Sequence, residues 1–372
     1  MVHILTDRRE LALAIQIYDA ANADILMTFH ESNAINSRLI GLEKPDLVLG
    51  SHLSAPEVVE LMQPLEMEAP VYDVIKHPGL MPLSFTLPMI VGRKDTMATL
   101  PDPFLVTPEE LRAAANAFNR KNRQGRITRM GFSPLWCDRF ITDLMDVRYP
   151  NLIKDGPERV NKDNLSSVMD ELRSWVNSSA GGPAQEQTFS QRYRYIPDEQ
   201  LILERRIAFT RMSPDEWAAL PDSITSQLDF RYLSGNRHIP VPNIVSAGIP
   251  KKSRQSDAAR DFLEWLIRPE TQLLLIDRWE QAQIPVFGYF GGLSAQEDVN
   301  NSEFTRHFPY MDGRIPEQHY LLVPEQRPHR WSRIASEVIP SWTASVLENP
   351  VQSQTLEEAY REWDLSSLTE EE

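Results

Sequence analysis

The sequence is poor in cysteine and has no long apolar run. Cys137 is the one cysteine in 372 residues, so no disulfide can form within a chain. That suits a reducing compartment, and it equally suits an exported protein large enough to fold without covalent staples. No apolar stretch is long enough to cross a bilayer, and no basic segment followed by an apolar one stands at the N-terminus. A cytoplasmic protein and an exported protein whose signal was removed both remain open.

The common signatures of catalysis and cofactor binding are also missing. The sequence has no glycine-rich nucleotide loop after a strand, no paired-histidine zinc motif, no CxxC and no GxSxG. The eight histidines are scattered without ligand spacing, so we expect no metal site. Because the motifs above are missing, we also expect no cofactor and no catalytic residue. Cys137 has no motif around it and is expected to be a small buried side chain. An acid pair such as glycosidases use stays open, because 53 acidic residues offer many unspecific pairs.

Positive charge is in short supply. The formal net charge of −15 argues against a general nucleic-acid binder, which carries a basic patch or stripe. Two segments nevertheless concentrate positive charge, Asn122–Arg126 and Arg192–Arg194. Each is either a local basic patch or a loop whose charges are simply solvated.

The length predicts two domains, and the pattern predicts an α/β fold. Short strands such as His3–Thr6 alternate with amphipathic helices, and the apolar run Leu47–Leu49 suits a strand buried on both faces. Helix starts are marked where a Ser or Thr stands three residues before a Glu, the capping-box spacing. These pairs are Ser54 with Glu57, Thr107 with Glu110, Ser213 with Glu216, and Thr355 with Glu358. The alternation favours mostly parallel sheets.

Two segments carry architectural information. Pro82–Asp95 is extended with a proline in its middle, which is typical of a segment that leaves one sheet and enters another. Asn243–Leu275 predicts a buried strand, a basic turn, an amphipathic helix, a break at Pro269 and a second helix. The Ser- and Gly-rich stretch Asn177–Gln191 is expected to be a loop.

Tryptophan is comparatively abundant, and two of the eight lie at the ends of elements. Trp136 follows a Gly-Phe-Ser-Pro-Leu loop, and Trp331 follows a polar run at a predicted helix start. Such rings can face a cleft and stack on the apolar C–H edges of a sugar. Trp175 and Trp265 lie on helix stripes and are expected in the core.

These segments together resemble the large bacterial solute-binding proteins of sugar ABC transporters, the maltose/maltodextrin-binding type in particular. The resemblance runs in the same order over nearly the whole chain. Its matching segments are Ile4–Arg8, Pro45–Leu49, Pro82–Asp95, Thr107–Leu111, Arg206–Thr210 and Val245–Leu275.

The resemblance implies a type II periplasmic-binding-protein-like α/β fold of two lobes, each with a mostly parallel sheet flanked by helices and joined by crossing strands. Residues 1–86 plus 246–295 would form the first lobe, and residues 87–245 plus 296–372 the second. The protein would be a monomeric, extracytoplasmic, non-enzymatic component of an importer. It would capture a neutral sugar or oligosaccharide between the lobes by hinge closure and dock to a membrane permease.

The resemblance also implies ligand-binding residues in the predicted first lobe. Asp7 and Arg8 match a charged pair that touches sugar hydroxyls, although an acid at a helix N-terminus beside a surface arginine would look the same. Ser51 and His52 lie in a loop whose relatives carry an aromatic residue, an acid and an arginine. Those are absent here, which counts against a maltodextrin specificity.

The remaining implied ligand-binding residues are aromatic or apolar. Trp136 lies in a loop matching an aromatic platform, and Met212 stands where relatives carry a stacking aromatic residue. Tyr289 falls in a loop expected to approach the cleft, and Trp331 matches a stacking tryptophan at a helix start.

Two other functions stay open. The altered loop at His52 and the methionine at position 212 would also suit an orphan surface lipoprotein, sensor or adhesin on the same fold that has lost ligand binding. A carbohydrate-active hydrolase is the second alternative.

Overall fold

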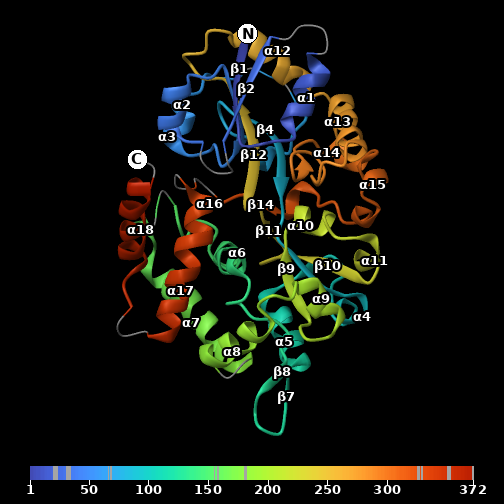
Figure 1. The fold of residues 1–372 in the computed structure, drawn as a ribbon, viewed down its shortest axis with the longest axis vertical. Helices are drawn as coiled ribbons and strands as arrows, with labels where there is room; N and C mark the ends of the chain where they lie inside the picture. The colour runs from blue at the N-terminus through green and yellow to red at the C-terminus, as the bar shows by residue number, and fades with distance from the viewer. Residues whose placement is uncertain are drawn as a thin grey trace. The chain divides into compact units, whose positions relative to one another are not determined.

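A computed structural model describes residues 1–19, 24–30, 35–65, 67, 69–154, 156, 159–179, 182–324, 327, 330–349 and 353–370. The chain divides into two compact units, each assembled from three stretches of sequence (Figure 1). The first unit contains Met1–Leu87, Pro214–Ala219 and Val241–Trp331. The second contains Pro88–Ser213, Leu220–Pro240 and Ser332–Glu372.

The first unit is built on a six-stranded sheet in the order β13-β4-β12-β3-β1-β2. Its strands are β1 (Val2–Thr6), β2 (Ile25–Phe29), β3 (Leu47–Ser51), β4 (Met81–Thr86), β12 (Asn243–Gly248) and β13 (Leu293–Ser294). Strand β1 pairs in parallel with β2 and β3, whereas β12 runs antiparallel to both β3 and β4. The central strands are apolar and buried on both faces, because helices cover the sheet on both sides.

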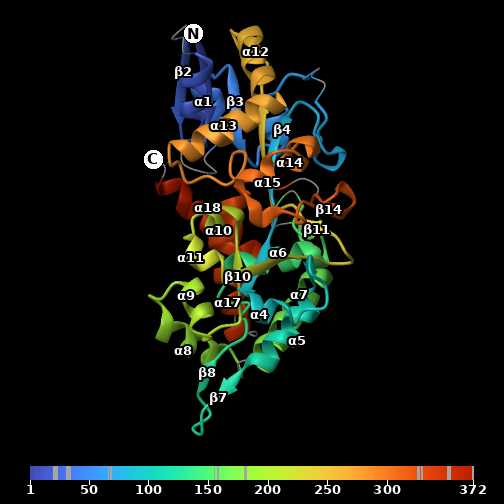
Figure 2. The ribbon, with the colours of Figure 1, turned by 90° about the vertical axis from the view of Figure 1, so that its right-hand side faces the viewer.

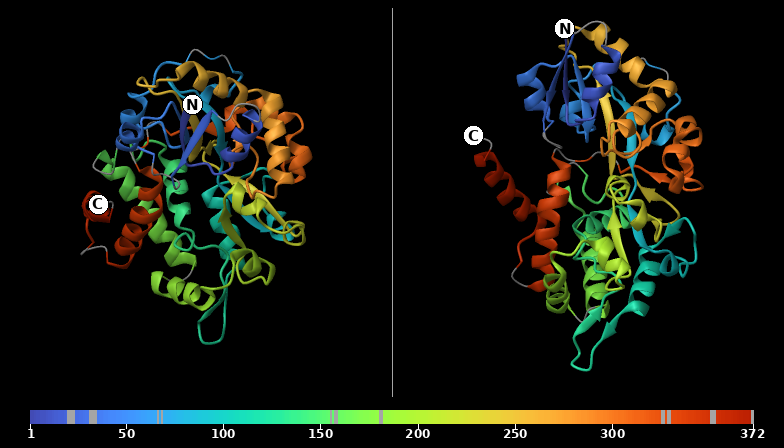
Figure 3. Two further views of the ribbon diagram at one scale, coloured as in Figure 1. Left: turned by 45° about the horizontal axis from the view of Figure 1, so that its top comes forward. Right: turned by 45° about the vertical axis from the view of Figure 1, so that its right-hand side comes forward.

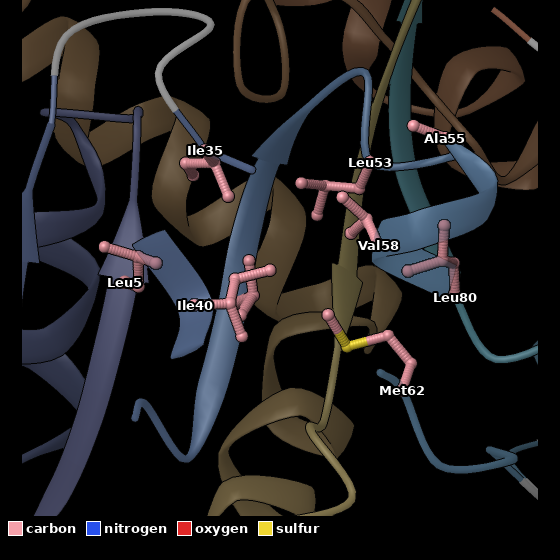
Figure 4. Packing of buried hydrophobic residues seen from close by; sticks show 9 residues of the cluster. Leu5, Ile35, Ile40, Leu53, Ala55, Val58, Met62 and Leu80 are labelled. Atoms are coloured by element: carbon pink, nitrogen blue, oxygen red, sulfur yellow. The ribbon is translucent and has the colours of Figure 1, made fainter. Parts of the chain in front are cut away.

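Helices pack on both faces of this sheet. On one side, α2 (Ser37–Glu43) and α3 (Pro56–Val59) cover a cluster of apolar side chains that includes Leu5, Val48 and Met62 (Figure 4). Elsewhere in the unit lie α1 (Leu11–Tyr18), α12 (Ser256–Leu266) and α13 (Pro269–Gln281), which Figure 2 shows beside the strands. Aromatic contacts join α1 to α12, and the Trp279 Nε1–H of α13 donates to the carbonyl of Glu10 at 3.0 Å.

The rest of the first unit consists of short elements. They are η1 (Asp73–Ile75), α10 (Pro214–Ala218), α14 (Glu297–Asn301), α15 (Phe304–His307), η3 (Pro309–Met311), η4 (Gln318–Tyr320) and β14 (Leu321–Leu322). Residues 296–331 therefore group with the first unit, whereas the sequence placed them in the second lobe. The reason is local bonding, since α14 packs on α13 and the Asn300 amide accepts from and donates to the backbone of Ser294.

The second unit contains a four-stranded sheet in the order β6-β10-β5-β9. Its strands are β5 (Met89–Arg93), β6 (Leu105–Val106), β9 (Phe209–Met212) and β10 (Leu228–Leu233). A separate hairpin pairs β7 (Arg120–Lys121) with β8 (Ile127–Arg129), and β11 (Ile239–Pro240) follows β10.

The helices of the second unit are α4 (Lys94–Met97), α5 (Pro108–Phe118), α6 (Asp138–Arg148), α7 (Lys162–Ser179), α8 (Pro183–Tyr193), α9 (Asp198–Leu203), α11 (Asp222–Thr225), α17 (Ile339–Glu348) and α18 (Leu356–Glu370). Before α17 come α16 (Trp331–Arg333) and a π-helical turn, η5 (Ile334–Val338). Helices α17 and α18 lie side by side (Figure 3). Trp175 of α7 is fully buried between Phe132 and Phe140, as its helix stripe predicted.

Several expected features are present. Residues 82–95 leave the first sheet as β4 and enter the second as β5, and the boundary between the units falls between Leu87 and Pro88. The predicted strand, helix, break and helix over Asn243–Leu275 are β12, α12, the break at Pro269 and α13. The expectation of mostly parallel sheets was too simple, since antiparallel β12 separates β3 from β4 and antiparallel pairs flank β5. Among the described helices, none combines the length and apolar character that a bilayer span requires.

Candidate functional site

The first unit concentrates polar side chains where β1 and β3 end. Asp7 and Arg8 follow β1 directly, and Ser51 is the last residue of β3. The register Thr6↔Leu49 places these neighbouring strand ends at one edge of the sheet. The carboxyl ends of parallel strands commonly form binding crevices in α/β folds.

These three residues form one bonded group. The side chain of Asp7 is fully buried, its Oδ1 lies 3.2 Å from the Arg8 Nε, and its Oδ2 accepts from the Ser51 N–H at 3.2 Å. The Arg8 guanidinium donates to the Ser51 hydroxyl, which also accepts from the Asn243 amide of β12 at 3.3 Å. The structure therefore brings Asp7, Arg8 and Ser51 together, and their hydrogen bonds restrict the arginine to one orientation.

A pocket of about 640 Å³ opens beside this group, wholly within the first unit. Its walls are Asp7, Arg8, Arg9, Glu10, Phe29, Asp215, Ile284, Pro285 and Val286. The last three residues supply an apolar wall, and the charged residues supply hydrogen-bond acceptors and donors. A mixture of an apolar wall and a few fixed polar groups is typical of small-molecule sites.

Asp215 enters the pocket from α10, the short stretch that belongs to the first unit although both its flanks belong to the second. Its Oδ1 accepts from the Phe287 N–H at 2.8 Å. Gly291 lies close to the same carboxylate: a Cβ at that position would stand 2.8 Å from the Asp215 Oδ2, and its φ of +83° also favours glycine. Residue 291 therefore has to be small for Asp215 to keep its place.

The electrostatics of the pocket depend on Arg8. Loss of solvent raises the pKa of Glu10, and the charge of Arg8 opposes that rise. Loss of solvent around the carboxylate likewise raises the pKa of Asp215, although the residue as a whole is exposed. The hydrogen bond from the Phe287 N–H and the charge of Arg8 oppose that rise. Arg9 lies over the ring of Phe29, 4.9 Å from its centroid. Arg8 is thus the cation that faces the three carboxylates of the pocket.

The predicted residues outside this group lie in different environments. His52 follows Ser51 in a left-handed backbone conformation, with φ +55°. Trp331 is buried, and the guanidinium of Arg327 lies 4.2 Å from its ring centroid. Tyr289 is fully buried, and its hydroxyl donates to the carbonyl of Leu266 at 2.8 Å. The expectation that Tyr289 faces a ligand is therefore wrong for this structure, because packing and that hydrogen bond occupy the whole side chain.

Trp136 and Met212 lie in the second unit. The ring of Trp136 is half-buried and packs edge-to-face on Phe189 of α8, with the centroids 5.4 Å apart. Met212 ends β9 and is buried. The thiol of Cys137 lies 3.5 Å from the Thr210 hydroxyl, so the Trp136 loop borders β9. Loss of solvent around the sulfur raises the pKa of the Cys137 thiol to about 12, although the residue as a whole is only partly buried.

Sequence reasoning missed seven of the nine wall residues of the pocket: Arg9, Glu10, Phe29, Asp215, Ile284, Pro285 and Val286. Asp215 shows a signal that could have been read, because it follows the end of β9 closely, as Asp7 follows β1. Nothing in the sequence indicates that α10 crosses into the first unit. Among the described residues, no group of three His, Cys, Asp or Glu side chains is placed to hold a metal ion.

Comparison with known proteins defines the class of fold. No protein-family model matches the chain, and no curated protein matches it. Solved structures of sugar-binding and ABC-transporter substrate-binding proteins do match over nearly its whole length, so the chain has their two-lobed, periplasmic-binding-protein-like fold.

Three of these neighbours illustrate the likeness. A cyclo/maltodextrin-binding protein complexed with maltotetraose has a TM-score of 0.64 at 15% identity, covering 96% of this chain and 94% of that one. The substrate-binding protein Lmo0181 from Listeria monocytogenes, in complex with cycloalternan, has a TM-score of 0.61 at 17% identity. The match covers 97% of this chain and 95% of that one. The sugar-binding protein MalE from Xanthomonas citri has a TM-score of 0.61 at 15% identity, and the match covers 98% of this chain and 95% of that one.

Proposed function

We propose that this protein is the substrate-binding component of an ABC importer and that it binds a sugar or oligosaccharide at the pocket of the first unit. The observation that carries the proposal is the bonded group of Asp7, Arg8 and Ser51 at the wall of that pocket. Carboxylates accept hydrogen bonds from hydroxyl groups, and a guanidinium held in one orientation donates to others. The fold supports the same function, since neighbours with this fold are described with bound sugars.

Each polar wall residue has a role in this proposal. Glu10 and Asp215 accept from ligand hydroxyls, Arg8 donates, and the wall Ile284–Val286 covers an apolar sugar edge. The fully buried Asp7 holds Arg8 in place for the ligand. From the second unit we propose Trp136 as a stacking surface. We also propose Ser51 and His52 as residues that position the loop, while Met212 and Trp331 stay predictions.

We further propose an extracytoplasmic location, a membrane permease as partner, and binding without catalysis. The hinge closure inferred from the sequence remains a prediction. It is tested by small-angle scattering with and without sugar, in which closure lowers the radius of gyration.

Ligand binding is tested by a thermal-shift screen with mono- and oligosaccharides, followed by titration calorimetry. A sugar present at about 100 times its Kd stabilises the folded state by about 2.7 kcal/mol, which raises Tm by several degrees. Asp7→Asn and Asp215→Asn should each weaken binding by about 10- to 100-fold, because the first removes the charge that holds Arg8 and the second removes a charged acceptor. Asp257→Asn, at an exposed acid of α12, is the matched control and should leave affinity unchanged.

Two outcomes would contradict the proposal. Absence of a shift with every sugar would favour the orphan surface protein that the sequence left open. Hydrolysis of a glycoside by the pure protein, abolished by Asp215→Asn, would favour the hydrolase.

A further inference from the structure

The β7–β8 hairpin of the second unit carries a concentration of positive charge. Residues 119–131 hold five cations and no acid, in a chain whose net charge is −15. All five are exposed: Arg120, Lys121, Arg123, Arg126 and Arg129. Figures 1 and 2 show the hairpin projecting from the body of its unit. The sequence left open whether this segment is a basic patch or a solvated loop.

The end of α8 extends the same surface. The Arg192 guanidinium donates to the carbonyl of Ile127 in β8 at 3.4 Å, which ties the helix end to the hairpin. Residues 187–197 add two exposed cations, Arg192 and Arg194, and no acid. We call these two stretches, 119–131 and 187–197, the basic tip. The structure records no salt bridge for its seven cations within the described part of the chain.

The tip is ordered rather than a loose loop. The Asn122 Oδ1 accepts from the N–H groups of Gln124 and Arg126, both at 2.9 Å, and Gly125 turns the chain with φ +76°. The backbone that carries the cations of the turn is therefore held in place before any partner arrives. Preorganisation of this kind lowers the entropy lost on binding.

An exposed aromatic ring is the second, independent feature. Tyr195 is 90% exposed, the largest value among the large hydrophobic side chains described as exposed. The Arg194 guanidinium lies 5.8 Å from its ring centroid. An exposed tyrosine beside arginines contributes nothing to the packing of the core. Tyrosine beside basic residues is typical of segments at a membrane–water interface.

We propose that the basic tip binds an anionic lipid surface, with its cations at the headgroup phosphates and Tyr195 at the interface. Each Lys or Arg near an anionic leaflet contributes to such binding, and the attraction decays within about a Debye length, about 8 Å at physiological salt. The described geometry favours lipid over single-stranded nucleic acid, because Tyr195 is a lone exposed ring, and Tyr193 already packs on Phe189.

The test is flotation of the full-length protein with vesicles of phosphatidylcholine containing about one-third phosphatidylglycerol. We expect binding to these vesicles, none to pure phosphatidylcholine, and loss of binding as salt rises from about 0.1 M to about 0.5 M. A quadruple serine variant of cations without a side-chain hydrogen bond in the structure should weaken binding by about 100-fold or more. Its substitutions are Lys121→Ser, Arg123→Ser, Arg126→Ser and Arg129→Ser. Tyr195→Ser alone should weaken binding by a few-fold.

The matched control removes the same amount of charge from exposed cations elsewhere and should keep vesicle binding. Its substitutions are Lys162→Ser, Lys252→Ser, Arg254→Ser and Arg268→Ser. Circular dichroism and Tm confirm that both variants fold. Equal loss in the two variants would reduce the effect to net charge and overturn the proposal. So would failure of the unaltered protein to bind the vesicles, or tighter binding to a single-stranded oligonucleotide or to inorganic phosphate than to lipid. None of these results depends on sugar binding.

Discussion

Asp46 ties two distant parts of the first unit together. Its Oδ2 accepts from the His3 N–H at 3.0 Å, and its Oδ1 accepts from the Ser253 hydroxyl and from the backbone N–H groups of Arg254 and Gln255. Burial alone would raise the pKa of Asp46, but these hydrogen bonds outweigh it and hold the pKa below its usual value. The ionised side chain therefore joins the start of the sheet to the turn before α12.

We predict that Asp46→Asn lowers the free energy of unfolding by about 1 to 3 kcal/mol near pH 7, because neutral acceptors replace charged ones and one oxygen becomes a donor. The folded-state pKa lies below the unfolded one, so the contribution is present above the unfolded pKa of about 4 and is lost as pH falls through the folded value. Urea unfolding at several pH values measures both effects. Asp257→Asn is the control, and an unchanged midpoint for Asp46→Asn would contradict the prediction.

The candidate site shows which residue properties the sequence reveals. Asp7 and Arg8 were predicted because the segment Ile4–Arg8 resembles a strand followed by a charged pair in sugar-binding proteins. Tyr289 was misassigned because a tyrosine in a loop can point into a cleft or into the core, and only the packing around it decides. Asp215 was missed because its membership of the first unit depends on contacts far away in sequence.

At the scale of elements, local capping signals give mixed results. Thr107 and Glu110 form the full reciprocal capping box of α5, and Thr355 and Glu358 bond in the same way. Ser54 was expected to cap α3, but that helix begins one residue later, after Ala55, without a side-chain cap. The spacing alone was insufficient there because the backbone turn placed a different residue at the cap.

We predict that Thr107→Ala costs about 1 kcal/mol of stability, since the Glu110 N–H loses the Thr107 hydroxyl as its acceptor. Ser54→Ala should cost close to nothing and serves as the matched control. Chemical denaturation of both variants checks the difference. Equal losses would show that the capping box adds nothing.

Helix α8 contains a buried acid, Glu186. Burial raises the pKa of Glu186 to about 8, although a hydrogen bond from the Leu135 N–H opposes that rise. Its Oε2 has no hydrogen-bond partner within the described part of the chain. Leu135 adjoins Trp136, whose ring packs on Phe189 of the same helix. The protonation of Glu186 is thus linked to the loop that carries the proposed stacking surface.

We predict that this acid makes the protein less stable as pH rises. The folded-state pKa lies above the unfolded value of about 4.3, so the folded state binds more protons, and stability falls from about pH 4.3 through about pH 8. Glu186→Gln should remove this decline and raise the free energy of unfolding by at most about a few kcal/mol near pH 8. Urea midpoints between about pH 5 and about pH 9 measure it, with Glu362→Gln on α18 as an exposed control. A decline of equal size in Glu186→Gln would show that another group causes it.

The stretch Asn177–Gln191 was expected to be a loop because it is rich in serine and glycine. In the structure α7 continues to Ser179 and α8 begins at Pro183, with proline at the first helical position; residues 180 and 181 lie outside the described residues. Burial of Phe189 against neighbouring elements stabilises α8. Tertiary packing overrode weak local propensity.

At the scale of the whole molecule, the discontinuity of both units has an energetic consequence. Strand β12 lies between β3 and β4, so the sheet of the first unit is incomplete without residues far along the chain. Helices α12 and α13 come from the same later stretch.

We therefore predict that residues 1–87 alone do not fold. That fragment leaves the facing edges of β3 and β4 unpaired and loses the apolar cover of two helices. Far-UV circular dichroism and denaturant titration of the fragment, beside the full chain, provide the measurement. A cooperative unfolding transition in the fragment would refute the prediction.

The sequence by itself determined the elements and the crossing between sheets. Apolar runs, capping boxes and prolines are local signals, and they indicated β1, α5, the passage from β4 to β5, and the strand–helix–helix order of β12, α12 and α13. Only the tertiary structure decided that residues 296–331 belong to the first unit, that Asp215 lines its pocket and that Tyr289 does not. These outcomes depend on contacts between residues far apart in the chain, and no local pattern encodes which distant surfaces bury one another.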